Sequence, residues 1–341
     1  MILMTFGPLA AALLIVLLVM PFFLPFLKKL KFGQTIYELG PQAHLSKQGT
    51  PNMGGIVIAL GTLIAGVAGA LLCQKEWGTA CRLYPLLFTM IFSMAVGFAD
   101  DFIKDVKKNH EGLKPMQKIA GQVIVGLAVS VYCYFTAGSD ILLPFTAGKT
   151  WDLGIFYIPL MTVLVIFMTN SANLQDGVDG ILSTVTMIGM MAFGLIAVLL
   201  KDSIMQQNGA GCAAVCFALT GACLGFFRFN HHPAKIFMGD TGSMFIGGAM
   251  VGIAMACKCQ LLLLLICFTS VMSSVSVILQ TTYFKITKKK YGQGKRIFKM
   301  APIHHHFELC GMSEEKVVLM YELVTLVLSA AAVLSLISFF G

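Results

Sequence analysis

The chain has 341 residues, of which 57% are hydrophobic and only 12% are charged, and its mean hydropathy is +0.83. Soluble domains carry about 25% charged residues, so the composition excludes an ordinary soluble domain and indicates a membrane protein. The formal net charge is +8, but no module that combines basic residues with stacking aromatic residues is visible, and we predict no nucleic acid partner.

Ten apolar segments follow one another, and we interpret each as a helix that crosses a bilayer. They cover residues 6–27, 54–73, 83–99, 119–138, 156–169, 181–200, 211–227, 242–257, 260–284 and 317–340. The sequence therefore predicts an all-α polytopic membrane protein with ten transmembrane helices, organised as a single domain over residues 1–341. The fifth and eighth segments are shorter than the usual ~20 residues, which predicts a cavity that admits water and polar groups.

The distribution of charge predicts the orientation. Nineteen of the 24 Lys and Arg residues fall in the five loops that follow the odd-numbered segments. By the positive-inside rule these loops are cytoplasmic and both termini are extracytoplasmic. All seven histidines lie on the same side, and five aspartates lie there at the mouths of the segments, namely Asp100, Asp101, Asp176, Asp179 and Asp240. We predict an active site that five cytoplasmic loops form together.

The first two of these loops carry a lysine, two acids and a second lysine. Lys47 precedes a stretch rich in Gly and Pro, where it either meets a phosphate or is a positive-inside lysine before a helix start. Asp100 and Asp101 are adjacent carboxylates at the end of a segment, where they repel each other and face the negative end of the helix dipole. This arrangement favours a metal ligand and a general base. Lys118 stands where the fourth segment begins, within reach of a phosphate.

The third loop concentrates polar residues between two apolar runs. Asn170, Asn173, Asp176 and Asp179 recur every three residues, so in a helix they lie along one face. Acids at this depth are costly unless a cation or a donor meets them. We expect Asp176 and Asp179 in the first turn of the sixth segment, where the helix dipole favours negative charge. N-capping explains one aspartate but not four polar groups.

The last two loops carry an aspartate and three histidines. Asp240 has a glycine on either side of its Asp-Thr pair and precedes a predicted helix, which suits a carboxylate contact with Mg²⁺ and leaves backbone amides for phosphate oxygens. Oxygen ligands favour Mg²⁺ or Mn²⁺ over zinc. The side chains of the consecutive residues His304, His305 and His306 cannot all point in one direction. We interpret them as donors to phosphate rather than as metal ligands.

Taken together, these motifs resemble those of the phospho-N-acetylmuramoyl-pentapeptide transferases of bacterial cell-wall synthesis. This family belongs to a wider superfamily of polyprenyl-phosphate N-acetylhexosamine-1-phosphate transferases. The motifs are SKQGTPNMGG (46–55), GFADDF (97–102), NSANLQDGVDG (170–180), FMGDTGS (237–243) and APIHHHFELCG (301–311). Gln175 and Asn52 stand where a threonine is common, Met312 stands where a tryptophan is usual, and the loop 285–296 is several residues longer.

The resemblance implies a multi-pass enzyme of the bacterial plasma membrane with Mg²⁺ as its cofactor. It would transfer phospho-MurNAc-pentapeptide from UDP-MurNAc-pentapeptide to undecaprenyl phosphate, giving lipid I and UMP for peptidoglycan synthesis, and it would form a homodimer in the membrane lipid. A polyprenyl-phosphate GlcNAc-1-phosphate transferase is the nearest alternative. A cation-coupled transporter is a more distant one, with Glu322 as the acid inside a predicted span.

The resemblance also implies roles for individual residues. The implied catalytic groups are Asp100, Asp101, Asp240, His304, His305 and His306, and the implied metal ligands are Asp240, Asp176 and Asp100. The implied substrate contacts are Lys47, Lys118, Asn170, Asn173, Asp176, Asp179, Phe237 and Gln280. Our hypothesis is direct transfer with Asp100 as the base, and an aspartyl intermediate remains the alternative.

Overall fold

The computed structural model of the chain describes residues 2–30, 47, 49–73, 83–106, 112–146, 148–200 and 209–336. His44, His110 and residues 337–340 of the last predicted segment lie outside these described residues, as do Ser46 and Gln48 of the first motif.

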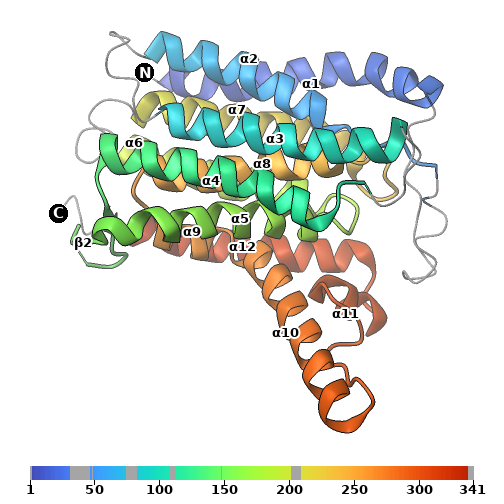
Figure 1. Cartoon of the computed structure of the whole chain (residues 1–341). Coiled ribbons are helices and arrows are strands. Elements are labelled where there is room, and N and C mark those ends of the chain that lie inside the picture. The colour runs from blue at the N-terminus through green and yellow to red at the C-terminus, as the bar shows by residue number, and fades with distance from the viewer. Residues whose placement is uncertain are drawn as a thin grey trace.

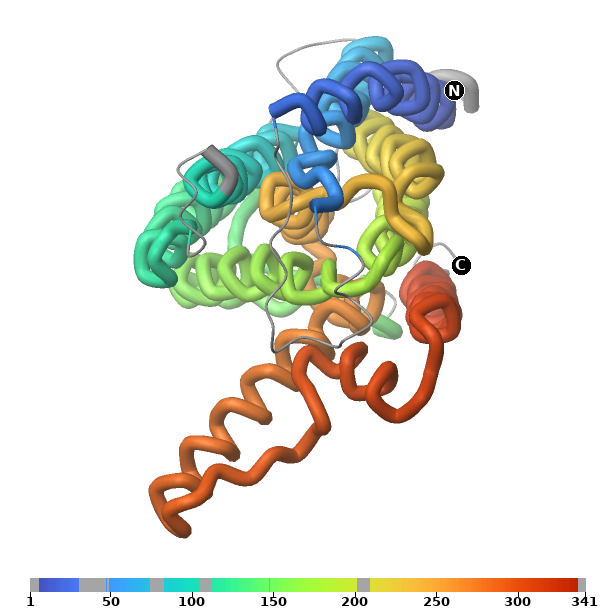
Figure 2. Tube along the Cα trace, turned by 90° about the vertical axis from the view of Figure 1, so that its right-hand side faces the viewer, coloured from blue at the N-terminus to red at the C-terminus, as the bar shows by residue number. Residues whose placement is uncertain are grey.

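Long helices run alongside one another and form a bundle (Figure 1). They are α1 (Ile2–Leu30), α2 (Gly55–Cys73), α3 (Leu83–Val106), α4 (Pro115–Ala137), α5 (Tyr157–Gln175), α6 (Ile181–Leu199), α7 (Gly209–Asn230), α8 (Gly239–Ala256) and α12 (Glu314–Leu334). α8 is buried at every position from Thr241 to Ala256, and the view along the bundle places it inside the ring of its neighbours (Figure 2). The start of α8 is therefore held from several sides.

A short hairpin and a 3₁₀ turn connect α4 with α5. Strands β1 (Asp140–Leu142) and β2 (Thr150–Asp152) pair antiparallel, with Asp140 opposite Asp152, and η3 (Gly154–Phe156) leads into α5. The hairpin lies at the end of the bundle where α4 ends and α5 begins, which is the end opposite to the polar clusters described below (Figure 1).

The chain bends sharply between α9 (Gln260–Ile266) and α10 (Phe268–Tyr291), whose axes differ by 83°. The prediction of one continuous helix over 260–284 is therefore wrong. The first turns of α10 are rich in Ser and Thr, and they bond to the end of α5: Gln175 Nε2 donates to Thr269 Oγ1 at 3.1 Å. These bonds hold the bend against the bundle, in a stretch without a single Gly or Pro.

Beyond the bend, α10 leaves the bundle sideways, and the chain returns beside it to α11 (Ile303–Leu309) (Figures 1 and 2). We call residues 276–302 the arm. Side chains of α10 hold the returning chain, because Thr287 Oγ1 accepts a hydrogen bond from Lys295 N at 2.8 Å and Ser276 Oγ accepts one from Ile303 N at 3.0 Å. Specific hydrogen bonds between α10 and the returning chain thus hold the arm in its conformation.

Eight of the described helices are long and apolar enough to cross a membrane, or nine if α9 and α10 count as one span. This confirms an all-α, multi-pass membrane protein, whereas ten crossings and the side of the termini stay predictions. The helix ends also differ from those expected. α5 continues to Gln175 and α6 begins only at Ile181, so Asp176 and Asp179 lie in the turn between them and not in the first turn of α6.

Candidate active site

Polar side chains from five connecting regions meet at one end of the bundle. They come from the end of α3, the start of α4, the α5–α6 turn, the α7–α8 connection, and the α11–α12 region together with Lys47. We call Asp100, Asp101, Asp176 and Asp240 the acid cluster. Its members come from three of these regions, which confirms that distant loops assemble here.

Asp101 anchors the start of α8. Its carboxylate accepts hydrogen bonds from the backbone N–H of Asp240 at 3.1 Å, the N–H of Thr241 at 2.8 Å and the hydroxyl of Thr241 at 2.6 Å. Asn52 Nδ2 donates a further bond at 3.4 Å. Gly239 has a φ of +73°, and a Cβ there would lie 2.6 Å from Asp101 Oδ2. The carboxylate of Asp101, which is buried, thus fixes the position of Asp240.

Asp240 and Asp100 lie side by side and share two ammonium groups. Lys104 Nζ lies 3.1 Å from Asp240 Oδ2 and 2.6 Å from Asp100 Oδ2. Lys118 Nζ lies 2.8 Å and 3.7 Å from the same two oxygens. On its other oxygen Asp240 accepts a hydrogen bond from Asn173 Nδ2 at 2.6 Å. Two acids and two cations are therefore within reach of one phosphate-sized ligand.

Asp176 completes the acid cluster. Burial, followed by the negative charges of Asp240, Asp101 and Asp179, raises the pKa of Asp176 to about 8. Among the described residues none donates a hydrogen bond to this carboxylate. Its surroundings favour a bound cation, because a divalent ion would remove the cost of charging it. An all-oxygen donor set of carboxylates fits Mg²⁺, as the sequence predicts.

A second polar cluster surrounds the ammonium group of Lys47. Lys47 Nζ lies 2.8 Å from Asp179 Oδ1 and 2.6 Å from Glu314 Oε2. His232 Nδ1 is 3.2 Å from the other oxygen of Asp179. Ligand atoms of Asp179, His232 and Glu314 lie within 4.8 Å of one another, a spacing that suits a metal ion. Here the ammonium of Lys47 already supplies the positive charge.

The three histidines of α11 point to different neighbours, as expected. His304 is fully buried against Gly177, where a Cβ would lie 2.5 Å from His304 Nε2 and 3.1 Å from His305 Nε2. His305 Nδ1 is 2.6 Å from Glu308 Oε2. His306 Nδ1 instead accepts a hydrogen bond from Lys299 N at 3.1 Å. Two of the histidines thus adjoin the α5–α6 turn, and the third contacts the arm.

Three of the predicted substrate contacts use their polar groups elsewhere. Asn170 Nδ2 donates to Gln122 Oε1 of α4 at 2.8 Å. The side chain of Gln280 is bonded to the backbone of Phe298, with Nε2 donating at 2.9 Å and Oε1 accepting at 3.0 Å. Phe237 is half-buried, and its backbone N–H donates to Pro51 O at 2.8 Å. Their roles toward a substrate stay predictions.

Several groups of these clusters were missed by the sequence reasoning. Lys104 was given no role, although its spacing of four residues after Asp100 on a helix was a usable signal. Thr241 and Asn52 belong to recognised motifs but were given no role. Glu314 and His232 carried no local signal at all, because their partners lie far away in the chain.

Comparison with known proteins agrees with the family resemblance of the sequence motifs. The model of glycosyl transferase family 4 matches residues 83–258. A phospho-N-acetylmuramoyl-pentapeptide-transferase of Desulfitobacterium hafniense is 39% identical over an alignment of 337 positions that covers 96% of each chain. The protein of the same name from Bacillus subtilis is 41% identical over 321 residues, 94% of each chain. That from Caldicellulosiruptor bescii is 42% identical over 313 residues, 92% of this chain and 91% of the relative.

Proposed function

Because the chain belongs to the phospho-N-acetylmuramoyl-pentapeptide transferases, we propose that it makes lipid I at the acid cluster. It transfers phospho-MurNAc-pentapeptide from UDP-MurNAc-pentapeptide to undecaprenyl phosphate and releases UMP. An oxygen of the lipid phosphate bonds to the phosphorus next to the sugar, and the bond from that phosphorus to UMP breaks. A GlcNAc-1-phosphate transferase is not favoured, since the relatives above all carry the pentapeptide-transferase name.

The observation that carries this assignment is the pairing of two lysines with two carboxylates. An anionic nucleophile approaching an anionic diphosphate chiefly needs positioning and neutralisation of charge. Lys104 and Lys118 are held at 2.6–3.7 Å from Asp100 and Asp240. As substrate phosphates arrive, these ammonium groups exchange carboxylate oxygens for phosphate oxygens, which are equally good partners.

The two adjacent acids of α3 have different roles in this mechanism. Asp101 is occupied by N–H and hydroxyl donors of α8, so it positions Asp240. Asp100 Oδ1 accepts a hydrogen bond from Leu113 N at 2.7 Å and Oδ2 faces the two lysines, and we assign this carboxylate to accept a proton from the lipid phosphate. Transfer is direct in this scheme. A phosphorylated Asp100 or Asp101 trapped during turnover would instead establish a covalent intermediate.

A divalent cation belongs to the proposed site. Asp240, Asp176 and Asp100 would hold it, and when bound it would neutralise charge on the diphosphate. The free carboxylate of Asp176 supports this assignment, because it has no donor among the described residues. The protein's own contribution is to hold Asp240 in place, through the bonds of Asp101 to the start of α8 and the bond from Asn173 to the Asp240 carboxylate.

The protein is a multi-pass membrane protein of a bacterial family, and we place its acid cluster at the cytoplasmic face. The excess of Lys and Arg in the loops at this end supports that orientation. A soluble nucleotide and a membrane lipid both reach a site at this level. A homodimer follows from the family resemblance, and the mass of the purified protein in detergent or nanodiscs tests it.

The test of the assignment is the release of UMP from purified protein supplied with undecaprenyl phosphate. UDP-MurNAc-pentapeptide should release UMP only with Mg²⁺, and UDP-GlcNAc should not. Asp240→Asn should abolish release, whereas Asp152→Asn, in the hairpin at the other end of the bundle, should leave it intact. Undiminished turnover after complete removal of divalent ions would refute the proposed site.

A further inference from the structure

The connection between α4 and α5 carries large apolar side chains on its surface, at the end of the bundle opposite to the acid cluster (Figure 1). They are Phe145, Trp151, Ile155 and Phe156, with exposed fractions of 65%, 59%, 61% and 74%. We call these four residues the hairpin patch. Exposed apolar groups that gather in this way mark a surface that contacts something other than water.

The hairpin is fixed to the helix ends beside it. Leu142 of β1 is fully buried, and its N–H donates to Lys258 O at 2.7 Å, two residues after α8 ends. Lys258 Nζ lies 2.5 Å from Asp140 Oδ1. β1 is therefore level with the end of α8, and β2 with Trp151 runs alongside it. The hairpin lies where the spans end and is held there.

The length of α5 places the hairpin patch at the boundary of a bilayer. α5 has 19 residues from Tyr157 to Gln175, which is about 28 Å and close to the ~30 Å hydrocarbon core. Phe156 directly precedes this helix, so it lies where acyl chains meet headgroups. Trp and other amphipathic aromatic rings are enriched at this level of a membrane.

The hairpin patch continues a surface that runs along α5. Leu160 and Val163 are 49% and 60% exposed, and they follow Phe156 at the spacing of one helix face. Because α5 is long and apolar enough to cross a membrane, acyl chains cover this face. On α4, Phe135 near the helix end is 78% exposed. The surface that faces lipid thus extends past the end of the span onto the hairpin.

Few charges accompany the hairpin patch. Residues 138–156 contain three charged residues, which are Asp140, Lys149 and Asp152. Asp140 is paired with Lys258, and Asp152 accepts a hydrogen bond from Gly154 N at 2.9 Å. Lys149 is exposed, and a lysine at a membrane boundary directs its ammonium group to lipid phosphates. Insertion of this surface therefore leaves neither acid without a partner.

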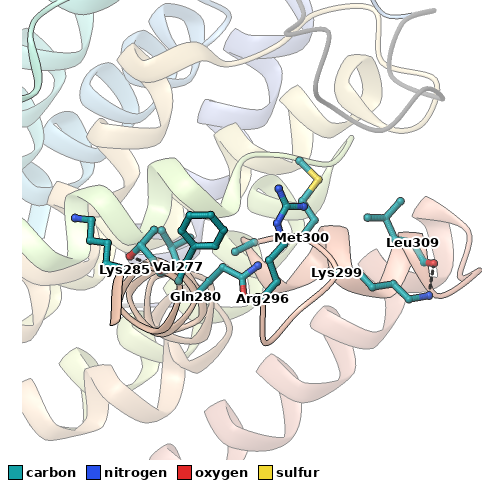
Figure 3. A pocket seen from close by; sticks show the side chains of 10 residues that line it. Val277, Gln280, Lys285, Arg296, Lys299, Met300 and Leu309 are labelled. Carbon is teal, nitrogen blue, oxygen red and sulfur yellow. Dashed lines mark hydrogen bonds between the residues drawn. The ribbon is translucent and has the colours of Figure 1, made fainter. Parts of the chain in front are cut away.

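The arm differs from the hairpin patch in this respect. Its pocket of about 540 Å³ combines apolar side chains with three cations, which are Lys285, Arg296 and Lys299 (Figure 3). Such a concentration of positive charge attracts anions. The hairpin patch has no comparable charge, so attraction to a charged partner does not account for it, whereas contact with the uncharged part of a lipid does.

We propose that the hairpin patch inserts into the headgroup boundary of the membrane leaflet at this end, with Trp151 and Phe156 as its anchors. The partner is the phospholipid itself. Insertion sets the depth of α5 in the bilayer, and the other end of α5 carries Asn173, which contacts Asp240. The proposal does not depend on the reaction that the acid cluster performs.

The experiment uses the fluorescence of Trp151, one of the two tryptophans of the chain. Trp77→Phe leaves Trp151 as the sole tryptophan, and the full-length protein is placed in phosphatidylcholine vesicles. Phosphatidylcholine brominated close to the glycerol should quench Trp151 more strongly than lipid brominated near the chain ends. Aqueous iodide should quench it much less than it quenches N-acetyltryptophanamide.

A deeper reporter is the matched control. Val163→Trp, with both native tryptophans replaced by Phe, places the ring on the same face of α5 about 9 Å further into the membrane. Lipid brominated near the chain ends should gain in quenching for this protein relative to Trp151. Melting curves check that each reporter protein is folded. The native protein measured against Trp151→Phe gives the contribution of Trp151 without the Trp77 replacement.

Two results would overturn the proposal. Strong quenching of Trp151 by iodide, with no quenching by either brominated lipid, would mean that the hairpin patch faces water. Protection from iodide and from both lipids would mean that protein covers it, either a second copy of the chain or another partner. Dilution to one copy per vesicle would then separate these two kinds of protein contact.

Discussion

The ammonium nitrogen of Lys47 lies 2.6 Å from Oε2 of Glu314, a residue 267 positions further along the chain. This ion pair joins the stretch before α2 to the first turn of α12, and both side chains are only 11% exposed. Asp179 shares the same ammonium group. Lys47 is therefore positioned by two acids, and a substrate phosphate that contacts it meets a side chain already fixed in place.

Removing the charge of Glu314 should impair the enzyme without unfolding it. Glu314→Gln leaves Lys47 bonded to Asp179 alone, and we expect KM for the nucleotide to rise about tenfold, as for the loss of one charge-assisted hydrogen bond. Glu315→Gln is the matched control, since Glu315 is the exposed neighbour on the same helix turn. Equal kinetics for the two variants would show that Glu314 does not position Lys47.

Lys104 should be needed for the chemical step. Lys104→Met removes a cation that contacts both Asp100 and Asp240, and kcat should fall about 10²-fold, the usual cost of losing one preorganised charge in a site. Lys235→Met, an exposed lysine of the α7–α8 connection, should retain full turnover. A kcat for Lys104→Met within a factor of about two of the native value would contradict the role.

The adjacent acids of α3 should fail in different ways. Asp101→Asn replaces an oxygen that faces N–H donors of α8, so its thermal midpoint in detergent should fall along with activity, as for about 2 kcal/mol of lost buried hydrogen bonding. Asp100→Asn should lose turnover while its melting curve stays near the native one. Both properties are measured on the same preparations. The opposite pattern would reverse the two roles.

Gly177 should tolerate no side chain. In Gly177→Ala the new Cβ would lie 2.5 Å from His304 Nε2, so α11 must move away from the α5–α6 turn, at a cost of about 1–3 kcal/mol. We expect lower thermal stability and a loss of turnover together. Gly7→Ala, where a Cβ meets nothing within 4 Å, should lower neither property. Native stability in Gly177→Ala would indicate that α11 adjusts freely.

The positions of the acids were predictable because polar groups at the ends of apolar runs are costly and therefore informative. Asp100 and Asp240 do share a site, and Asn173 does contact Asp240. The pairing of Lys47 with Glu314 was not predictable, since no local pattern links residues so far apart. Nor was the bend near Cys267, because the stretch contains no Gly or Pro and reads as one apolar run.

The bend links the direction of the arm to the position of Asp176. Gln175 precedes Asp176 directly, and its side chain bonds to Thr269 and Ser270 just after the bend. α10 therefore starts beside Asp176, and the arm extends from that point away from the bundle. The same bonds thus fix the end of α5 and the direction of the arm together.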